Sequence, residues 1–197
     1  MGITIHYKGK LNNPDLLNTF CDEIKDIAKD MNWSFNTFDN DLNKPSSSYL
    51  DKNGNIKGHI PIKGLNVTIH PKAESLSFLF DKNGNLRNLL VMTYKNGNES
   101  EVSNIFIKTQ FVPIETHITI IKLLEYIKKK YISNLEVIDE GNYWETRDKN
   151  ILEEKLSFLN KEIDQIGNII SEIIVDGTDS PEAILRKIEN VLNKKIL

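Results

Sequence analysis

Apolar and polar residues alternate in several short stretches of the chain. Leu76, Phe78 and Phe80 are spaced two apart, as strand residues on one face would be. A period of two is typical of a β-strand with one buried face. The stretches predicted to be strands on this pattern include residues 3–7, 33–38, 76–80, 105–111 and 135–138. The pattern therefore predicts an antiparallel β-sheet.

One five-residue stretch, DKNGN, occurs at residues 51–55 and again at 81–85, and a shorter copy, KNGN, occupies 95–98. An EF-hand calcium loop needs glycine at its sixth position and glutamate at its twelfth. Both full copies have apolar residues there. Asn-Gly between alternating apolar stretches instead indicates a tight hairpin turn. We interpret the copies as hairpin corners of a meander, with a strand from Leu86 through Met92 after the second.

Two segments have apolar residues at the three- and four-residue spacing of a helix. Asn13 and Pro14 favour a helix start, and the spacing continues to Met31. Pro113 precedes a second such segment that runs to Lys130. A sheet with one apolar face needs a cover, and these helices supply it. Residues 1–147 are therefore predicted to form an α+β domain, with two amphipathic helices on one side of the sheet.

The pattern changes after Asp148, where apolar residues step by four and three as in a heptad repeat. These residues are Leu152, Leu156, Leu159, Ile163, Ile166, Ile170 and Ile173. Gly177 is predicted to end this helix, and Ser180-Pro181 to begin another. Residues 148–197 are thus expected to form a helical hairpin that packs on the first domain or mediates a homodimer.

Composition narrows the class of function. A net charge of −3 gives no electrostatic case for nucleic acid as a partner. No apolar stretch reaches the length of a membrane span, so no membrane association is expected. The single cysteine, Cys21, excludes an intrachain disulfide and favours a cytoplasmic location. Local signatures such as a phosphate-binding loop or paired Cys-x-x-Cys are absent from the sequence, and no cofactor is expected.

Three residues are candidates for catalysis. His117 lies near the start of the second helix, where the helix dipole disfavours the protonated imidazole and leaves a neutral base. Asp139 and Glu140, after the last predicted strand, could act as acid and base. The alternative for His117 is a structural histidine that bonds to a neighbour at the edge of the core.

Two further groups of residues are considered as a metal site and as a ligand-binding loop. His70, Glu74 and His117 could hold a divalent metal if they converged, but their spacing does not require this, and no metal site is expected. The candidate binding residues in the loop 139–147 are Tyr143, Trp144, Glu145 and Arg147. The aromatics could wall a pocket and the arginine could hold an anion. Alternatively, the aromatics pack the C-terminal hairpin onto the sheet, and the acidic residues stay solvated.

The sequence favours a non-catalytic protein-binding or regulatory module. An exposed sheet face, the aromatic loop or the C-terminal hairpin would contact another protein or a second copy of the chain. The alternative is a small hydrolase or metal-assisted enzyme that uses His70, Glu74, His117 and the 139–147 loop.

Overall fold

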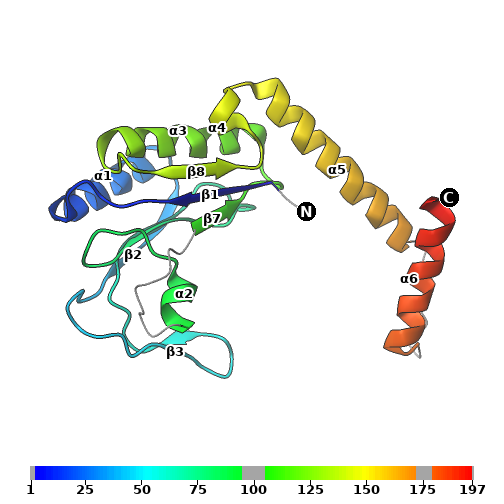
Figure 1. Ribbon diagram of the computed structural model, residues 1–197, viewed down its shortest axis with the longest axis horizontal. Helices are drawn as coiled ribbons and strands as arrows, with labels where there is room; N and C mark the ends of the chain where they lie inside the picture. Colours follow the sequence, from blue (N-terminus) through cyan, green and yellow to red (C-terminus); the bar gives the residue numbers. More distant parts are fainter. Residues whose placement is uncertain (1–2, 95–104, 172–178, 197) are drawn as a thin grey trace. The chain divides into compact units, whose positions relative to one another are not determined.

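The computed structural model describes residues 3–94, 105–171 and 179–196 (Figure 1). It consists of antiparallel sheets and helices, which confirms the predicted α+β class. The chain divides into two compact units, one ending at Leu152 and the other beginning at Glu153. Among the residues described, none of the helices is both long enough and apolar enough to cross a membrane.

The strands of the first unit form separate antiparallel ladders. They are β1 (Thr4–Lys8), β2 (Ser34–Asp39), β3 (Tyr49–Leu50), β4 (Ile56–Lys57), β5 (Lys63–Thr68), β6 (Leu76–Phe80), β7 (Ile105–Lys108) and β8 (Glu136–Asp139). They pair in the orders β7-β1-β8, β2-β5-β6 and β3-β4. This order differs from one continuous meander, because β1 pairs with two strands that lie far along the chain.

Two helices of the first unit, Leu17–Asp30 and Ile114–Lys130, lie close to the predicted positions, and two short helices lie where a strand and a loop were predicted. The helices are α1 (Leu17–Asp30), α2 (Leu89–Tyr94), α3 (Ile114–Lys130), α4 (Tyr143–Thr146), α5 (Lys149–Ser171) and α6 (Pro181–Ile196). A 3-10 turn precedes α1, and Asn13 Oδ1 accepts a hydrogen bond from Asp15 N there, at 3.0 Å. Pro113 occupies the N-cap position of α3.

The first two Asn-Gly stretches are turns, but only the first joins two strands that pair with each other. Residues 51–55 connect β3 to β4, as predicted. After residues 81–85, a single bridge between Phe80 and Leu86 is followed by α2, so the predicted strand through Met92 is wrong. The cause is Asn88, whose Oδ1 accepts from Leu90 N at 3.0 Å and starts a helix. The third copy, at 95–98, lies outside the described residues.

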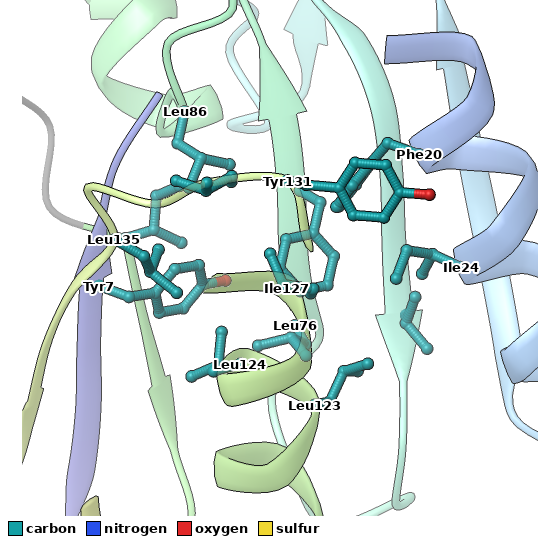
Figure 2. Close-up of a cluster of buried hydrophobic side chains, with 14 of the residues drawn as sticks. Tyr7, Phe20, Ile24, Leu76, Leu86, Leu123, Leu124, Ile127, Tyr131 and Leu135 are labelled. Atoms are coloured by element: carbon teal, nitrogen blue, oxygen red, sulfur yellow. The ribbon is translucent and has the colours of Figure 1, made fainter. Parts of the chain in front are cut away.

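One hydrophobic core joins both helices to the two larger sheets. Phe20 of α1 makes edge-to-face contacts with Phe78, Phe80 and Tyr131, with ring centroids 5.2 to 5.5 Å apart. Leu124 and Ile127 of α3 belong to the same buried cluster (Figure 2). Leu76, Tyr7 and Leu135 are drawn beside them in Figure 2. The core therefore fixes the sheets against α1 and α3.

Two polar contacts fix the orientation of these elements. The buried Tyr7 hydroxyl donates to Ser77 O at 2.8 Å and accepts from Ser77 N at 2.9 Å, which ties β1 to β6. Glu23 of α1 accepts hydrogen bonds from Lys130 Nζ at 2.7 and 2.6 Å, and from the hydroxyls of Tyr126 and Tyr131. Partial burial would raise the pKa of Glu23, but the bonds from Lys130 and Tyr131 outweigh it and lower the pKa.

The second unit contains most of α5 and all of α6. Asp148 Oδ1 accepts from Asn150 N at 2.8 Å at the start of α5. Ser180 Oγ accepts from Ala183 N at 3.3 Å at the start of α6, as predicted. The predicted stop at Gly177, and Ile173 before it, lie outside the described residues. Packing of these helices as a hairpin, or as a homodimer contact, stays a prediction.

Candidate functional site

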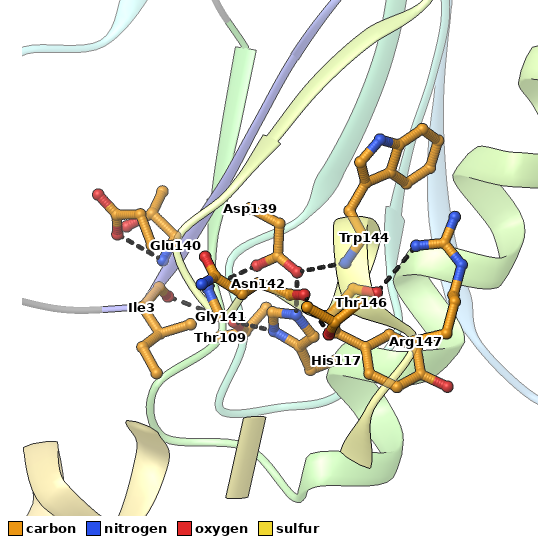
Figure 3. Close-up of polar contacts among 12 residues, drawn as sticks. Ile3, Thr109, His117, Asp139, Glu140, Gly141, Asn142, Trp144, Thr146 and Arg147 are labelled. Atoms are coloured by element: carbon orange, nitrogen blue, oxygen red, sulfur yellow. Dashed lines mark hydrogen bonds and ion pairs between the residues drawn. The ribbon is translucent and has the colours of Figure 1, made fainter. Parts of the chain in front are cut away.

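A buried polar centre lies where three segments of the first unit meet, and it consists of Thr109, His117 and Asp139 (Figure 3). His117 Nδ1 shares a hydrogen bond with Thr109 Oγ1 at 2.8 Å. His117 Nε2 lies 3.2 Å from Asp139 Oδ2. The side chains of His117 and Asp139 have zero exposure. The structure thus joins two of the three candidate catalytic residues.

The sheet pairing brings these residues together. Asp139 is the last residue of β8 and lies opposite Ile5 of β1. Thr109 directly follows β7 on the other side of β1, and its N–H donates to Ile3 O at 2.9 Å. His117 lies in the first turn of α3, on the helix face that enters the core. Each side chain is therefore held by a regular element or by the backbone next to one.

Asp139 is an acceptor with a full set of donors. Its Oδ1 accepts from Gly141 N at 2.7 Å, and its Oδ2 accepts from Trp144 N at 2.9 Å as well as facing His117. Burial alone would raise the pKa of Asp139, but the bonds from His117 and the two N–H groups outweigh it and lower the pKa. An ionised carboxylate can only accept hydrogen bonds. His117 Nε2 is therefore protonated and donates a hydrogen bond to Asp139.

Gly141 and Leu152 close this centre. A Cβ atom on Gly141 would lie 2.6 Å from Leu152 Cδ1 and 3.0 Å from His117 Cε1. Leu152 is itself fully buried. Lys149 Nζ, one turn earlier on α5, donates to Glu115 Oε1 at 2.8 Å and ties the start of α5 to the start of α3. A substrate could reach His117 or Asp139 only if these residues moved.

Glu140 points away from the buried polar centre. Its Oε2 accepts from Thr4 N at 2.8 Å, and its Oε1 lies 3.9 Å from His6 Nε2 on the opposite face of the sheet. Side chains of successive strand residues alternate between faces, so Asp139 and Glu140 diverge. In this arrangement they cannot serve one substrate as the acid and base that their adjacency suggested.

The three residues considered for a metal do not come together. Glu74 Oε2 accepts from Lys108 N at 3.0 Å, and His70 Nδ1 accepts from Lys72 N at 3.1 Å. Both ring nitrogens of His117 have protein partners. In the described parts of the chain, no group of three or more His, Cys, Asp or Glu side chains is arranged to hold a metal ion.

The four candidate binding residues lie in and directly after α4. Tyr143 and Trp144 are partly buried and pack against the main core. The Arg147 guanidinium lies 5.0 Å from the Trp144 ring centroid, donates to Tyr143 O at 2.8 Å and pairs with Glu125 of α3. Glu145 is exposed. The aromatics and the arginine thus anchor the loop to the core and to α3.

An apolar row crosses the outer face of the β7-β1-β8 sheet. The register places His6 of β1 opposite Phe106 of β7 and opposite Ile138 of β8. Phe106 is 43% exposed and Ile138 is 65% exposed. The His6 and Phe106 ring centroids are 6.1 Å apart. Phe106, His6 and Ile138 are named the outer row below.

Charged side chains border the outer row at both edges of the sheet. Lys108 lies two residues after Phe106 on β7, on the same face of the strand, and is exposed. Glu136 and Glu140 flank Ile138 on the β8 side, with Glu136 Oε2 2.7 Å from Lys8 Nζ of the central strand. The face therefore combines an apolar centre with two glutamates at the β8 edge, and with Lys108 beside the Glu74 carboxylate at the β7 edge.

Comparisons with protein-family models, curated proteins and solved structures found no significant match to this chain. The arrangement of its own residues is therefore the basis for inferring a function.

Proposed function

We propose that this protein is a non-catalytic protein-binding module and that its binding surface is the outer face of the β7-β1-β8 sheet. The observation that carries the proposal is the outer row, with Phe106 and Ile138 43% and 65% exposed on a face that the core holds rigid from behind. Exposed apolar residues grouped on one surface and bordered by charges are typical of interaction sites.

The spacing of the outer row suits one amphipathic helix of a partner. Phe106 and Ile138 lie on strands separated by β1, so about 10 Å lies between their backbones. A helix rises about 10.5 Å over seven residues, which places apolar side chains at i, i+4 and i+7 over the three positions of the row. The sheet is only three short strands wide. It therefore suits a helix better than a globular surface, which needs about 800 Å² on each partner.

The charges beside the outer row define the partner further. A helix crossing the strands would place one end over the β8 edge, near Glu136 and Glu140, and the other over the β7 edge, near Lys108. We propose a partner helix with basic residues at the end that lies over the β8 edge. Such complementarity fixes the orientation of binding more than it adds to affinity.

The geometry favours this function over the hydrolase alternative. His117 and Asp139 have zero exposure and bond to each other, and Glu140 points to the other face. His70 and Glu74 bond to backbone amides elsewhere. We propose a cytoplasmic location, which the single cysteine, Cys21, supports because it excludes an intrachain disulfide. Self-association through 148–197 remains a separate prediction.

A peptide library displayed on phage tests the proposal directly. Selection on the full-length protein is expected to enrich peptides with apolar residues at i, i+4 and i+7 and basic residues at one end. Binding of these peptides should fall at least about tenfold in a Phe106→Ser, Ile138→Ser double variant, because each substitution removes an apolar contact worth about 1 kcal/mol or more. The measurement is the Kd by fluorescence anisotropy.

The control is Tyr49→Ser, which removes an exposed aromatic side chain from β3, outside the outer face. It should bind the selected peptides as the unchanged protein does. All variants alter exposed positions and should unfold at nearly the same temperature. Equal binding by the double variant, or selection of no peptide, would exclude the outer face as the binding surface.

A further inference from the structure

A second site is a cavity of about 350 Å³ at the end of β1, which shares Lys8 and Glu136 with the border of the outer row and does not include the buried polar centre. Its walls come from three segments: the end of β1, the residues after the second DKNGN turn, and the segment that leads into β8. The side chains in its lining include Lys8, Lys10, Asn85, Arg87, Asn134 and Glu136. Its volume lies within the range of small-molecule sites, about 300–1,000 Å³.

Hydrogen bonds fix the walls of this cavity relative to one another. Leu86 N donates to Gly9 O at 2.9 Å, and Leu11 N donates to Gly84 O at 2.9 Å. Lys10 N donates to Asn134 Oδ1 at 3.1 Å, which ties the third segment to the first. The cavity is therefore formed by ordered backbone, and a ligand would not need to organise it.

The two DKNGN turns differ in a way that concerns the cavity. In both, the aspartate accepts from the N–H groups of the third and fifth residues, at 2.8 to 3.0 Å. Only Asp81 is buried, and it also holds Arg87, with Nε at 2.7 Å and Nη2 at 2.6 Å from Oδ2. The residue equivalent to Arg87 in the first turn is Lys57, which is exposed. The turn itself thus does not require a buried ion pair.

The buried ion pair is informative because such pairs seldom add net stability. Asp81 fixes the orientation of the Arg87 guanidinium in the cavity wall. Two lysines line the same cavity, and Lys8 is paired with Glu136 at 2.7 Å. Among the described residues, Lys10 has no ion-pair partner. The lining therefore offers positive charge, amide groups at Asn85 and Asn134, and one carboxylate.

We propose that this cavity binds a small phosphorylated polyol, such as a sugar phosphate. Lys10 provides a cationic group that attracts a phosphate, and Asn134 keeps its NH₂ as a donor because its Oδ1 accepts from Lys10 N. The Glu136 carboxylate, neutralised by Lys8, is an acceptor for a sugar hydroxyl. The combination of the Lys10 cation with a paired carboxylate distinguishes a phosphorylated polyol from a simple anion.

Amide NMR shifts of the full-length protein, titrated with glucose 6-phosphate, inorganic phosphate and glucose, test this proposal. Glucose 6-phosphate should cause saturable shifts at residues 8–10, 85–87 and 134–136. Inorganic phosphate should shift the same amides with at least about fivefold weaker affinity, because it lacks the hydroxyls that Glu136 would accept. Equal affinity for the two, or shifts that do not saturate at these amides, would overturn the proposal.

A matched pair of lysine substitutions separates the cavity from general attraction of anions. Lys10→Gln should weaken binding of glucose 6-phosphate about tenfold, as expected for loss of one charged contact. Lys57→Gln removes the same charge at the exposed first turn and should leave the affinity unchanged. Equal weakening by both variants would show that binding reflects net charge alone, which would also overturn the proposal.

Discussion

Replacing Asp139 with alanine is expected to lower the free energy of unfolding by about 3–5 kcal/mol. The carboxylate accepts hydrogen bonds from His117 Nε2, Gly141 N and Trp144 N in a closed site. The substitution leaves these donors buried without an acceptor, and each such group carries a desolvation penalty. Urea denaturation followed by circular dichroism measures the change.

Glu140→Ala is the matched control for this prediction. The neighbouring carboxylate is half-exposed and points to the other face, so its loss should reduce stability by about 1 kcal/mol or less. If the two alanine variants lost similar stability, Asp139 would not be the centre of a closed network.

The contribution of Asp139 to stability is expected to depend on pH. The pKa of Asp139 is lower in the folded chain than its ordinary value of 3.8, so its contribution to stability is fully present above about pH 4. It is lost as pH falls through the folded-state pKa. The stability difference between the unchanged protein and Asp139→Asn should therefore shrink as pH is lowered from 5 towards 2. A difference that stayed constant would contradict the charged state of Asp139.

Gly64→Ala is expected to lower the free energy of unfolding by at least about 3 kcal/mol. Gly64 has φ +147, and a Cβ there would lie 1.9 Å from Phe78 O. Gly64 is on the central strand β5, opposite Phe38 of β2 and Leu79 of β6. The strand cannot shift to relieve the overlap without disturbing a ladder on one side. Chemical denaturation gives the change.

Gly54→Ala tests whether this loss comes from the close approach. Gly54 also has a positive φ, +78, but nothing lies within 4 Å of a Cβ added there. Its substitution should reduce stability by about 1–2 kcal/mol, the cost of the left-handed backbone alone. Similar losses for the two variants would mean that the contact with Phe78 O is relieved at little cost.

Local patterns predicted the elements better than their partners. Period-two and helical spacing located β7, α1 and α3, because these signals depend on nearby residues. The pairing of β1 with β7 and β8 depends on packing between distant segments, which one sequence does not display. Leu90 and Met92 fit a strand or a short helix equally, and Asn88 decided in favour of the helix.

The candidate site was predictable only in part. From the sequence, His117 near a helix start could be a base or a structural histidine. Its burial with Thr109 and Asp139 depends on the meeting of three segments that are not adjacent along the chain. For the outer row, alternation within β7 places Phe106 on the face opposite Ile105 and Ile107. The register that aligns it with distant residues has no local signal. The cavity beside Arg87 was missed for the same reason, although the repeated DKNGN stretch marks one of its walls.

Carbethoxylation of histidines, followed by mass spectrometry, tests most directly whether the outer face is the binding surface and the buried polar centre is closed to small molecules. His6, whose side chain is 35% exposed, should react in the free protein and become protected when a selected helical peptide binds. His117, with zero exposure, should remain unmodified in both states until the protein unfolds. Rapid modification of His117, or reaction of His6 at the same rate with peptide bound, would contradict the proposed binding face.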